Sequence, residues 1–144
     1  MKKYIANLFL LVALSSFLFT SCSKDAEGVI YETEELAVSF ASNVQLEEVT
    51  EANQGKVSIP VYRGKANGEA TVGVSFTDES GVLKLVSSEA KFAAGQHVAY
   101  LEVSFGSVEK LEVGKENKSV LSFTNKEQVS ISGTDKLKLV VVRK

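Results

Sequence analysis

The chain has few of the residues that carry most catalytic and metal-binding chemistry. It contains one cysteine, Cys22, one histidine, His97, and no tryptophan. A single histidine excludes a histidine metal cluster and leaves a serine triad no second choice of base. The sequence also lacks a phosphate-binding glycine loop and a paired-cysteine motif. We therefore predict no enzyme and no cofactor, and we expect His97 to be a surface side chain.

Neighbouring acidic residues do not change this prediction. They occur at Glu34–Glu35, Glu47–Glu48 and Asp78–Glu79. Adjacent residues of a strand face opposite ways, so these acids are not the paired carboxylates of a glycosidase. A catalytic carboxylate pair assembled from distant parts of the chain remains the alternative.

The first 21 residues have the layout of an export signal. Lys2 and Lys3 precede an apolar run over residues 8–19, which is shorter than the roughly 20 residues that span a bilayer. The segment Phe19-Thr20-Ser21-Cys22 resembles the lipobox of bacterial lipoproteins, with phenylalanine where leucine is usual. This resemblance implies cleavage before Cys22 and palmitate-type acylation of that residue. Because two or three acyl chains anchor a protein firmly, we predict that Cys22 attaches the chain to the membrane. The alternative, a plain secretory signal, would leave an odd thiol in an oxidising compartment.

The mature chain is predicted to be acidic. Residues 1–21 hold two of the 16 basic residues, so cleavage leaves 123 residues with a formal charge of about −4. An acidic body argues against nucleic-acid binding. Residues 22–35 are polar and acidic without strand alternation, which predicts a flexible linker. Within them, Lys24-Asp25-Ala26-Glu27 resembles the surface-export signal of Bacteroidota lipoproteins. The resemblance implies the cell-surface side of the outer membrane, and a merely solvated linker facing the periplasm is the alternative.

Residues 36–144 show the two-residue period of strands. Alternating apolar residues predict seven or eight strands and no helix, with runs near residues 36–40, 57–62, 70–76, 98–105, 121–123, 129–131 and 137–141. Asn67-Gly68 predicts a hairpin turn, and Asp78 to Gly81 another turn. Pro60 lacks an N–H, so its strand should lie at a sheet edge or contain a bulge there. These patterns predict one all-β domain of two antiparallel sheets packed face to face.

Two segments of this domain resemble Calx-beta domains. The segment Lys56–Arg63, followed by a glycine-bearing turn and an alternating strand, resembles the second and third strands of that family. Phe92-Ala93-Ala94-Gly95-Gln96, before the strand at residues 98–105, resembles its phenylalanine-x-x-glycine corner. The resemblance covers about residues 36–143 and implies an immunoglobulin-like Greek-key β-sandwich. Related domains occur in small Bacteroidota lipoproteins.

The same resemblance implies where calcium would bind. Glu47 or Glu48 matches the family's first acidic position, and Asp78 matches a mid-domain aspartate. Several oxygens are needed for a hard cation, but Gly106–Lys110 stands where the family has an acidic pair. We expect ordinary solvated acids at these positions and no metal site.

By elimination, the sequence favours a noncatalytic binding or accessory module of an outer-membrane assembly, with a protein or glycan ligand at the cell surface. Tyr100 alternates with inward-facing residues, so it is a candidate for a contact patch, and a partly buried tyrosine is the alternative. A structural spacer or adhesion subunit that pairs through a sheet edge, and a calcium-dependent Calx-beta module, stay open as other functions. For the run at residues 136–143 we expect an ordinary core strand.

Overall fold

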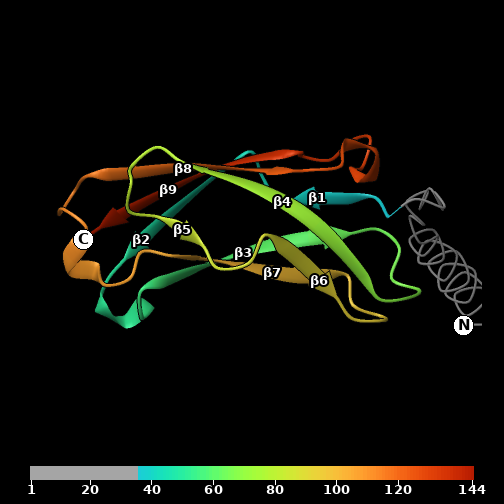
Figure 1. The fold of residues 1–144 in the computed structure, drawn as a ribbon, viewed down its shortest axis with the longest axis horizontal. Helices are drawn as coiled ribbons and strands as arrows, with labels where there is room; N and C mark the ends of the chain where they lie inside the picture. Colours follow the sequence, from blue (N-terminus) through green and yellow to red (C-terminus); the bar gives the residue numbers. More distant parts are fainter. Residues whose placement is uncertain (1–35) are drawn as a thin grey trace, which may run out of the picture. The chain divides into compact units, whose positions relative to one another are not determined.

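The computed structural model describes residues 36–144. The predicted signal peptide (1–21), the predicted linker (22–35) and the predicted lipidation site Cys22 therefore lie outside the described residues, and the boundary at residue 36 stays a prediction. Within the described part, no helix is long and apolar enough to cross a membrane. The strands, shown in Figure 1, are β1 (Val38–Phe40), β2 (Val44–Val49), β3 (Lys56–Arg63), β4 (Ala70–Asp78), β5 (Lys84–Leu85), β6 (Glu89–Phe92), β7 (Val98–Ser104), β8 (Glu116–Phe123) and β9 (Lys136–Arg143).

The strands form two sheets that lie face to face (Figure 1). One sheet has four strands in the order β1-β3-β7-β5, and the other has five in the order β2-β9-β8-β4-β6. All pairings are antiparallel except that of β2 with β9, which is parallel. This is the predicted immunoglobulin-like Greek-key β-sandwich. β9 lies between β2 and β8, so the expected core strand at residues 136–143 is confirmed.

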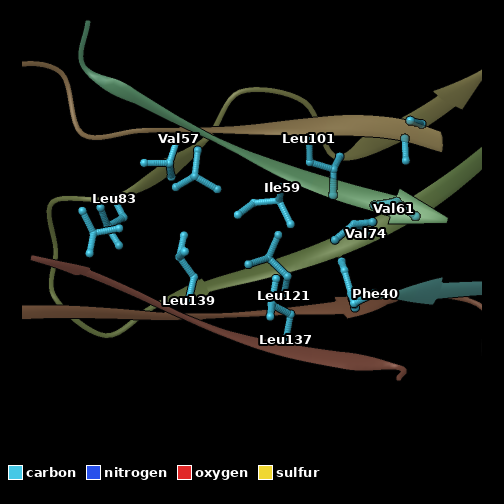
Figure 2. Close-up of a cluster of buried hydrophobic side chains, with 14 of the residues drawn as sticks. Phe40, Val57, Ile59, Val61, Val74, Leu83, Leu101, Leu121, Leu137 and Leu139 are labelled. Carbon is cyan, nitrogen blue, oxygen red and sulfur yellow. The ribbon is translucent and has the colours of Figure 1, made fainter. Parts of the chain in front are cut away.

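The core forms from the inward rows of both sheets. Along β7, Ala99, Leu101 and Val103 are buried, as the two-residue period predicts. Figure 2 shows Val57, Ile59 and Leu101 on one side of the core and Leu121, Leu137 and Leu139 on the other. The rings of Phe40 in β1 and Phe123 in β8 stack with centroids 4.3 Å apart, which joins the two sheets. Each fully buried aliphatic or phenyl side chain contributes roughly 1.5 to 3 kcal/mol, so burial stabilises the sandwich without a disulfide.

The first strand of the sandwich is divided between the sheets. β1 pairs with β3 in the four-stranded sheet, and β2 then continues in the five-stranded sheet. β1 pairs with β3 only at residues 61–63, so residues 56–60 of β3 have no partner in β1. β3 lies between β1 and β7 and is therefore not an edge strand as predicted, but Pro60 stands on a stretch of it where no neighbouring strand requires its N–H.

Three local predictions require correction or addition. Asn67-Gly68 does not form a hairpin, because β3 and β4 belong to different sheets and the segment is a crossover between them. Residues 129–131 are not a strand: Val129 makes an isolated bridge to Val38, and the side chain of Ile131 is 101% exposed in a turn. β2, β5 and β6 were not predicted, which raises the count to nine. β5 and β6 are short, and β2 turns Val44 and Leu46 outward.

A buried arginine fixes the corner that resembles Calx-beta domains. The Arg63 guanidinium is 5.0 Å from the centroid of the Phe92 ring. It donates hydrogen bonds from Nε to the Gln96 carbonyl (2.7 Å) and from Nη2 to the Ala93 carbonyl (2.8 Å). Gly95 adopts a φ of +79° and completes the turn. The corner therefore sets where β7 begins and how its outward side chains are placed.

Candidate functional site: an aromatic outer face

Two tyrosines lie on the outer face of the four-stranded sheet. Tyr62 is the next-to-last residue of β3 and Tyr100 lies in the middle of β7, and each alternates with buried neighbours. The side chain of Tyr100 is 66% exposed and that of Tyr62 is 42% exposed. The outward orientation predicted for Tyr100 is confirmed, and the partly buried alternative is wrong.

The strand register places these two rings on neighbouring strands. Tyr62 lies opposite Val98, and Pro60 lies opposite Tyr100. The tyrosines are therefore diagonal neighbours, a relation with a typical separation of roughly 7–8 Å that long side chains bridge. Val86, just after β5, donates its backbone N–H to the Glu102 carbonyl (2.9 Å) and has an exposed side chain. We call Pro60, Tyr62, Val86, Val98 and Tyr100 the tyrosine face.

An ion pair borders the tyrosine face. Lys56 of β3 and Glu102 of β7 are both about half exposed, and their Nζ and Oε2 atoms are 3.0 Å apart. Ser58 lies opposite Glu102 and adds a hydroxyl on the same side. The surface thus has apolar and aromatic groups at its centre and polar groups at one border. This distribution is typical of protein interfaces, which have an apolar core and a polar rim.

The tyrosine face does not line any of the main hollows described for residues 36–144. Those hollows lie at the ends of the sandwich, and one is lined by Thr50, Glu51, Ala52, Val108, Arg143 and Lys144. A second lies beside the Arg63 corner, and a third lies between the turns at residues 54–55 and 106–109. A ligand of the tyrosine face would therefore be held against a sheet surface and not enclosed in a pocket.

The acids that the Calx-beta resemblance pointed to are not brought together. Glu47 and Glu48 lie on β2, Asp78 ends β4, and β9 and β8 separate these strands in the sheet. Glu47 accepts a hydrogen bond from Gln45 (2.7 Å), and Glu48 pairs with Lys144 (2.5 Å). In the part of the chain that the structure describes, no three His, Cys, Asp or Glu side chains are placed to hold a metal ion.

Asp78 instead organises its own loop. Its Oδ1 accepts hydrogen bonds from the Ser80 N–H (2.9 Å) and hydroxyl (2.6 Å), and its Oδ2 accepts one from the Leu83 N–H (3.0 Å). Partial burial by itself raises the pKa of Asp78, but the hydrogen bonds from Ser80, Leu83 and Gly81 outweigh it and lower the pKa below the ordinary value of 3.8. The predicted turn at residues 78–81 is confirmed, and the carboxylate is its centre.

His97 is exposed, as predicted. Its Nδ1 lies 3.2 Å from the Arg63 carbonyl oxygen, at the start of β7. The described residues provide it no serine hydroxyl or carboxylate as a hydrogen-bond partner. The ring therefore extends the contacts of the Arg63 corner.

Neither a known protein family nor a curated protein matches this sequence. Solved structures do match its fold. The apo form of the Calx CBD1 domain matches with a TM-score of 0.54 at 14% identity, over 76% of this chain and 98% of that one. The fold is similar to that of Calx-beta domains. CBD12 from CALX1.2 matches with a TM-score of 0.55 at 15% identity over 75% of this chain, which spans only 45% of CBD12. A protein of unknown function from Bacteroides ovatus matches with a TM-score of 0.56 at 15% identity, over 76% of this chain and 52% of that one.

Sequence reasoning found Tyr100 but missed its neighbours. Tyr62 alternates with buried residues in the same way, so its outward orientation was readable. Its position beside Tyr100 depends on the register of β3 with β7, which no local pattern gives. Val86 follows a two-residue strand that carries no periodic signal.

Proposed function

We propose that this chain is a noncatalytic binding module that a lipid on Cys22 anchors to the outer membrane, and that it contacts its ligand through the tyrosine face. The observation that supports the contact surface is the exposure of Tyr100 beside Tyr62 on a sheet face. Tyrosine is enriched at interfaces because its ring is apolar and its hydroxyl can stay hydrated. Contiguous exposed apolar groups on a soluble domain mark interaction sites.

A protein partner fits this face better than a glycan does. The groups between the two rings are Pro60 and Val98, which cannot hydrogen-bond sugar hydroxyls through their side chains. The polar Lys56–Glu102 pair lies at the border, where a protein interface has its rim. We therefore propose an accessory role in a protein assembly of the outer membrane, with a surface glycan as the alternative that the test below separates.

The proposed anchor rests on the leader and on acyl-chain energetics. Each buried methylene adds about 0.8 kcal/mol, so two or three chains on Cys22 hold the module at the bilayer. Residues 22–35 reach about 45 Å when fully extended, enough to present the domain beyond the lipid headgroups. The acidic Asp25 and Glu27 after Cys22 support the cell-surface side of the membrane.

The contact surface is tested by capture from the native outer membrane. Immobilised wild-type protein, the Tyr62→Ser/Tyr100→Ser variant and the matched control Ile131→Ser are compared. We expect a protein component to be retained by the wild type and the control and lost with the double variant. A glycan-array signal with the same dependence would replace the protein partner by a glycan. Equal capture by all three proteins would contradict the tyrosine face.

The anchor is tested separately with a palmitate analogue in cells. We expect label on the wild type and none on Cys22→Ala, and we expect protease added to intact cells to remove the domain. Unchanged labelling of Cys22→Ala would refute the anchor. Protection of the wild type from protease would place it on the periplasmic face.

The calcium-dependent alternative lacks a donor set in residues 36–144. A ligand present at 100 times its dissociation constant stabilises a protein by about 2.7 kcal/mol. We expect millimolar calcium to leave the melting temperature unchanged. A rise of several degrees would support a calcium site in this domain.

A further inference from the structure

β2 is the longest sheet edge in the part of the chain that the structure describes. The two sheets end at β1, β5, β6 and β2, with three, two, four and six residues. Proteins usually shorten such edges or protect them with lysine or proline, because unpaired backbone groups attract other strands. β2 reads Val-Gln-Leu-Glu-Glu-Val and contains neither lysine nor proline.

The backbone of β2 offers hydrogen-bonding groups on its open side. Its parallel pairing with β9 uses odd-numbered residues: the Lys138 N–H donates to the Asn43 carbonyl (2.8 Å), and the Lys144 N–H to the Val49 carbonyl (3.3 Å). Because these directions alternate along a strand, the N–H and C=O groups of residues 44, 46 and 48 point away from β9. Among the described residues, only the Ser42 hydroxyl contacts one of them, the Val44 carbonyl (2.6 Å).

The side chains of this edge are apolar or already engaged within the chain. Val44 and Leu46 lie on the outer face of the five-stranded sheet and are 51% and 60% exposed. The two carboxylates of the strand are already engaged, Glu47 by Gln45 and Glu48 by Lys144. The edge therefore presents apolar side chains and two carboxylates, of which Glu48 is paired with a lysine and Glu47 is hydrogen-bonded to a neutral amide.

We propose that β2 is a self-association edge, at which β2 strands of two copies of this chain pair antiparallel about a two-fold axis. Residues on the open side must face one another, which leaves registers centred on Gln45, Leu46 or Glu47. If Glu47 faced Glu47 of the second copy, Leu46 would face Glu48. If Leu46 faced Leu46 of the second copy, Val44 would face Glu48. If Gln45 faces Gln45 of the second copy, Val44 of each copy faces Leu46 of the other, and Glu48 of each copy faces Ser42 of the other. Only the register centred on Gln45 matches apolar with apolar side chains, and it joins the two five-stranded sheets into one.

A short strand pair buries little surface, so the dimer is expected to be weak in dilute solution. Attachment to a membrane raises the local concentration and converts such a weak contact into a populated one. The tyrosine face lies on the other sheet, so each dimer would present two of these faces.

Disulfide trapping tests the register in the full chain carrying Cys22→Ser, so that an introduced cysteine is the only thiol. Facing residues that are not hydrogen-bonded to each other have Cα atoms about 4.5 Å apart, within the range of about 4.4–6.8 Å that a disulfide accepts. Gln45→Cys should therefore give a covalent dimer on mild oxidation, at least tenfold more than Ile131→Cys, a fully exposed cysteine in a loop.

A second substitution tests the edge itself. Leu46→Lys in the Gln45→Cys background brings like charges together at the edge and should lower the dimer yield at least tenfold. Tyr100→Ser in the same background should leave the yield unchanged, which separates this proposal from the tyrosine face. A Gln45→Cys yield equal to that of Ile131→Cys, a higher yield from Leu46→Cys, or no effect of a folded Leu46→Lys variant would overturn the proposal.

Discussion

The two outer faces of the sandwich differ although both sheets close over one core. The four-stranded sheet presents two tyrosines, a proline and valines, with one ion pair at its border. The five-stranded sheet carries the ion pairs Glu116–Lys118 (2.6 Å), Glu89–Lys91 (3.5 Å) and Glu48–Lys144, and its exposed aliphatic residues gather at β2. The hydrogen bond between Glu116 and Lys118 lowers the pKa of the glutamate and raises that of the lysine.

The difference separates two ways of meeting a partner. The tyrosine face offers side chains, which select a ligand by shape and ring contacts. The β2 edge offers backbone groups, which pair with any extended strand and obtain their selectivity from the facing side chains. Both surfaces depend on the same inward rows and inter-sheet loops, so substitutions there should affect both, whereas substitutions on one face should not affect the other.

The joint between the two sheets is the most sensitive point. Gly55 lies in the turn that leads from β2 to β3, with φ +77°, and a Cβ there would come 2.0 Å from the Gly106 carbonyl oxygen. Gly55→Ala combines left-handed strain with overpacking against backbone and should lower the free energy of unfolding by about 4 kcal/mol. Gly81→Ala, at φ +78° with nothing within 4 Å of its Cβ, is the matched control and should lose only about 1 kcal/mol. Equal losses in urea unfolding would contradict the close contact.

The shared core should weaken equally from either sheet. Leu101 of β7 and Leu139 of β9 are both buried on opposite sides of the core (Figure 2). Leu101→Ala and Leu139→Ala should each cost about 3 kcal/mol through lost contacts and a cavity. Tyr100→Ala, next to Leu101 but facing out, should change stability by less than about 0.5 kcal/mol. A large loss for Tyr100→Ala would mean that this ring serves packing and not binding.

The corner that orients β7 depends on a buried charge. Arg63→Met would remove the guanidinium hydrogen bonds to the Ala93 and Gln96 carbonyls, of which Ala93 keeps only that from the Gln96 N–H, and the contact of the charge with the Phe92 ring. We expect a loss of about 2 kcal/mol in the free energy of unfolding. Faster amide exchange should be confined to residues 92–98. Capture through the tyrosine face should also weaken, whereas dimer trapping at β2 should not.

The loop after β4 should make stability depend on acid. The pKa of Asp78 in the fold lies below 3.8, so its carboxylate stabilises the fold above that pH, and the contribution is lost as pH falls through the lowered pKa. Asp78→Asn should cost about 1.5 kcal/mol at pH 7, and the gap to the wild type should close below pH 3.8. Glu79→Gln is the control and should show no such convergence. A constant gap from pH 7 to pH 2 would refute the role of the carboxylate.

The strands with regular alternation could be predicted from the sequence because one face of each is buried. β3, β4, β7 and β8 follow that pattern, β9 follows it from Lys136 to Leu139, and the outward position of Tyr100 follows it too. β2 was missed because its apolar residues Val44 and Leu46 face solvent, so the pattern that marks a buried face was inverted. Apolar side chains that face solvent are expected at a sheet edge that pairs with a second chain.

Pairing between distant strands set the limits of prediction. Asn67-Gly68 has the composition of a hairpin turn, but β3 finds its partners in β1 and β7, and the local signal cannot show this. The same reason hid Tyr62 beside Tyr100. Asp78 was predicted in a turn, and its hydrogen bonds to Ser80 and Leu83, not a cation, explain an acid there.

Photo-crosslinking on intact cells shows whether the tyrosine face touches a partner in the outer membrane. A photoreactive phenylalanine analogue replaces Tyr100 in one variant and Ile131 in another, and both chains keep Cys22. We expect a discrete covalent adduct in the outer membrane from position 100 and none from position 131. No adduct from position 100, or the same adduct from both positions, would contradict this expectation.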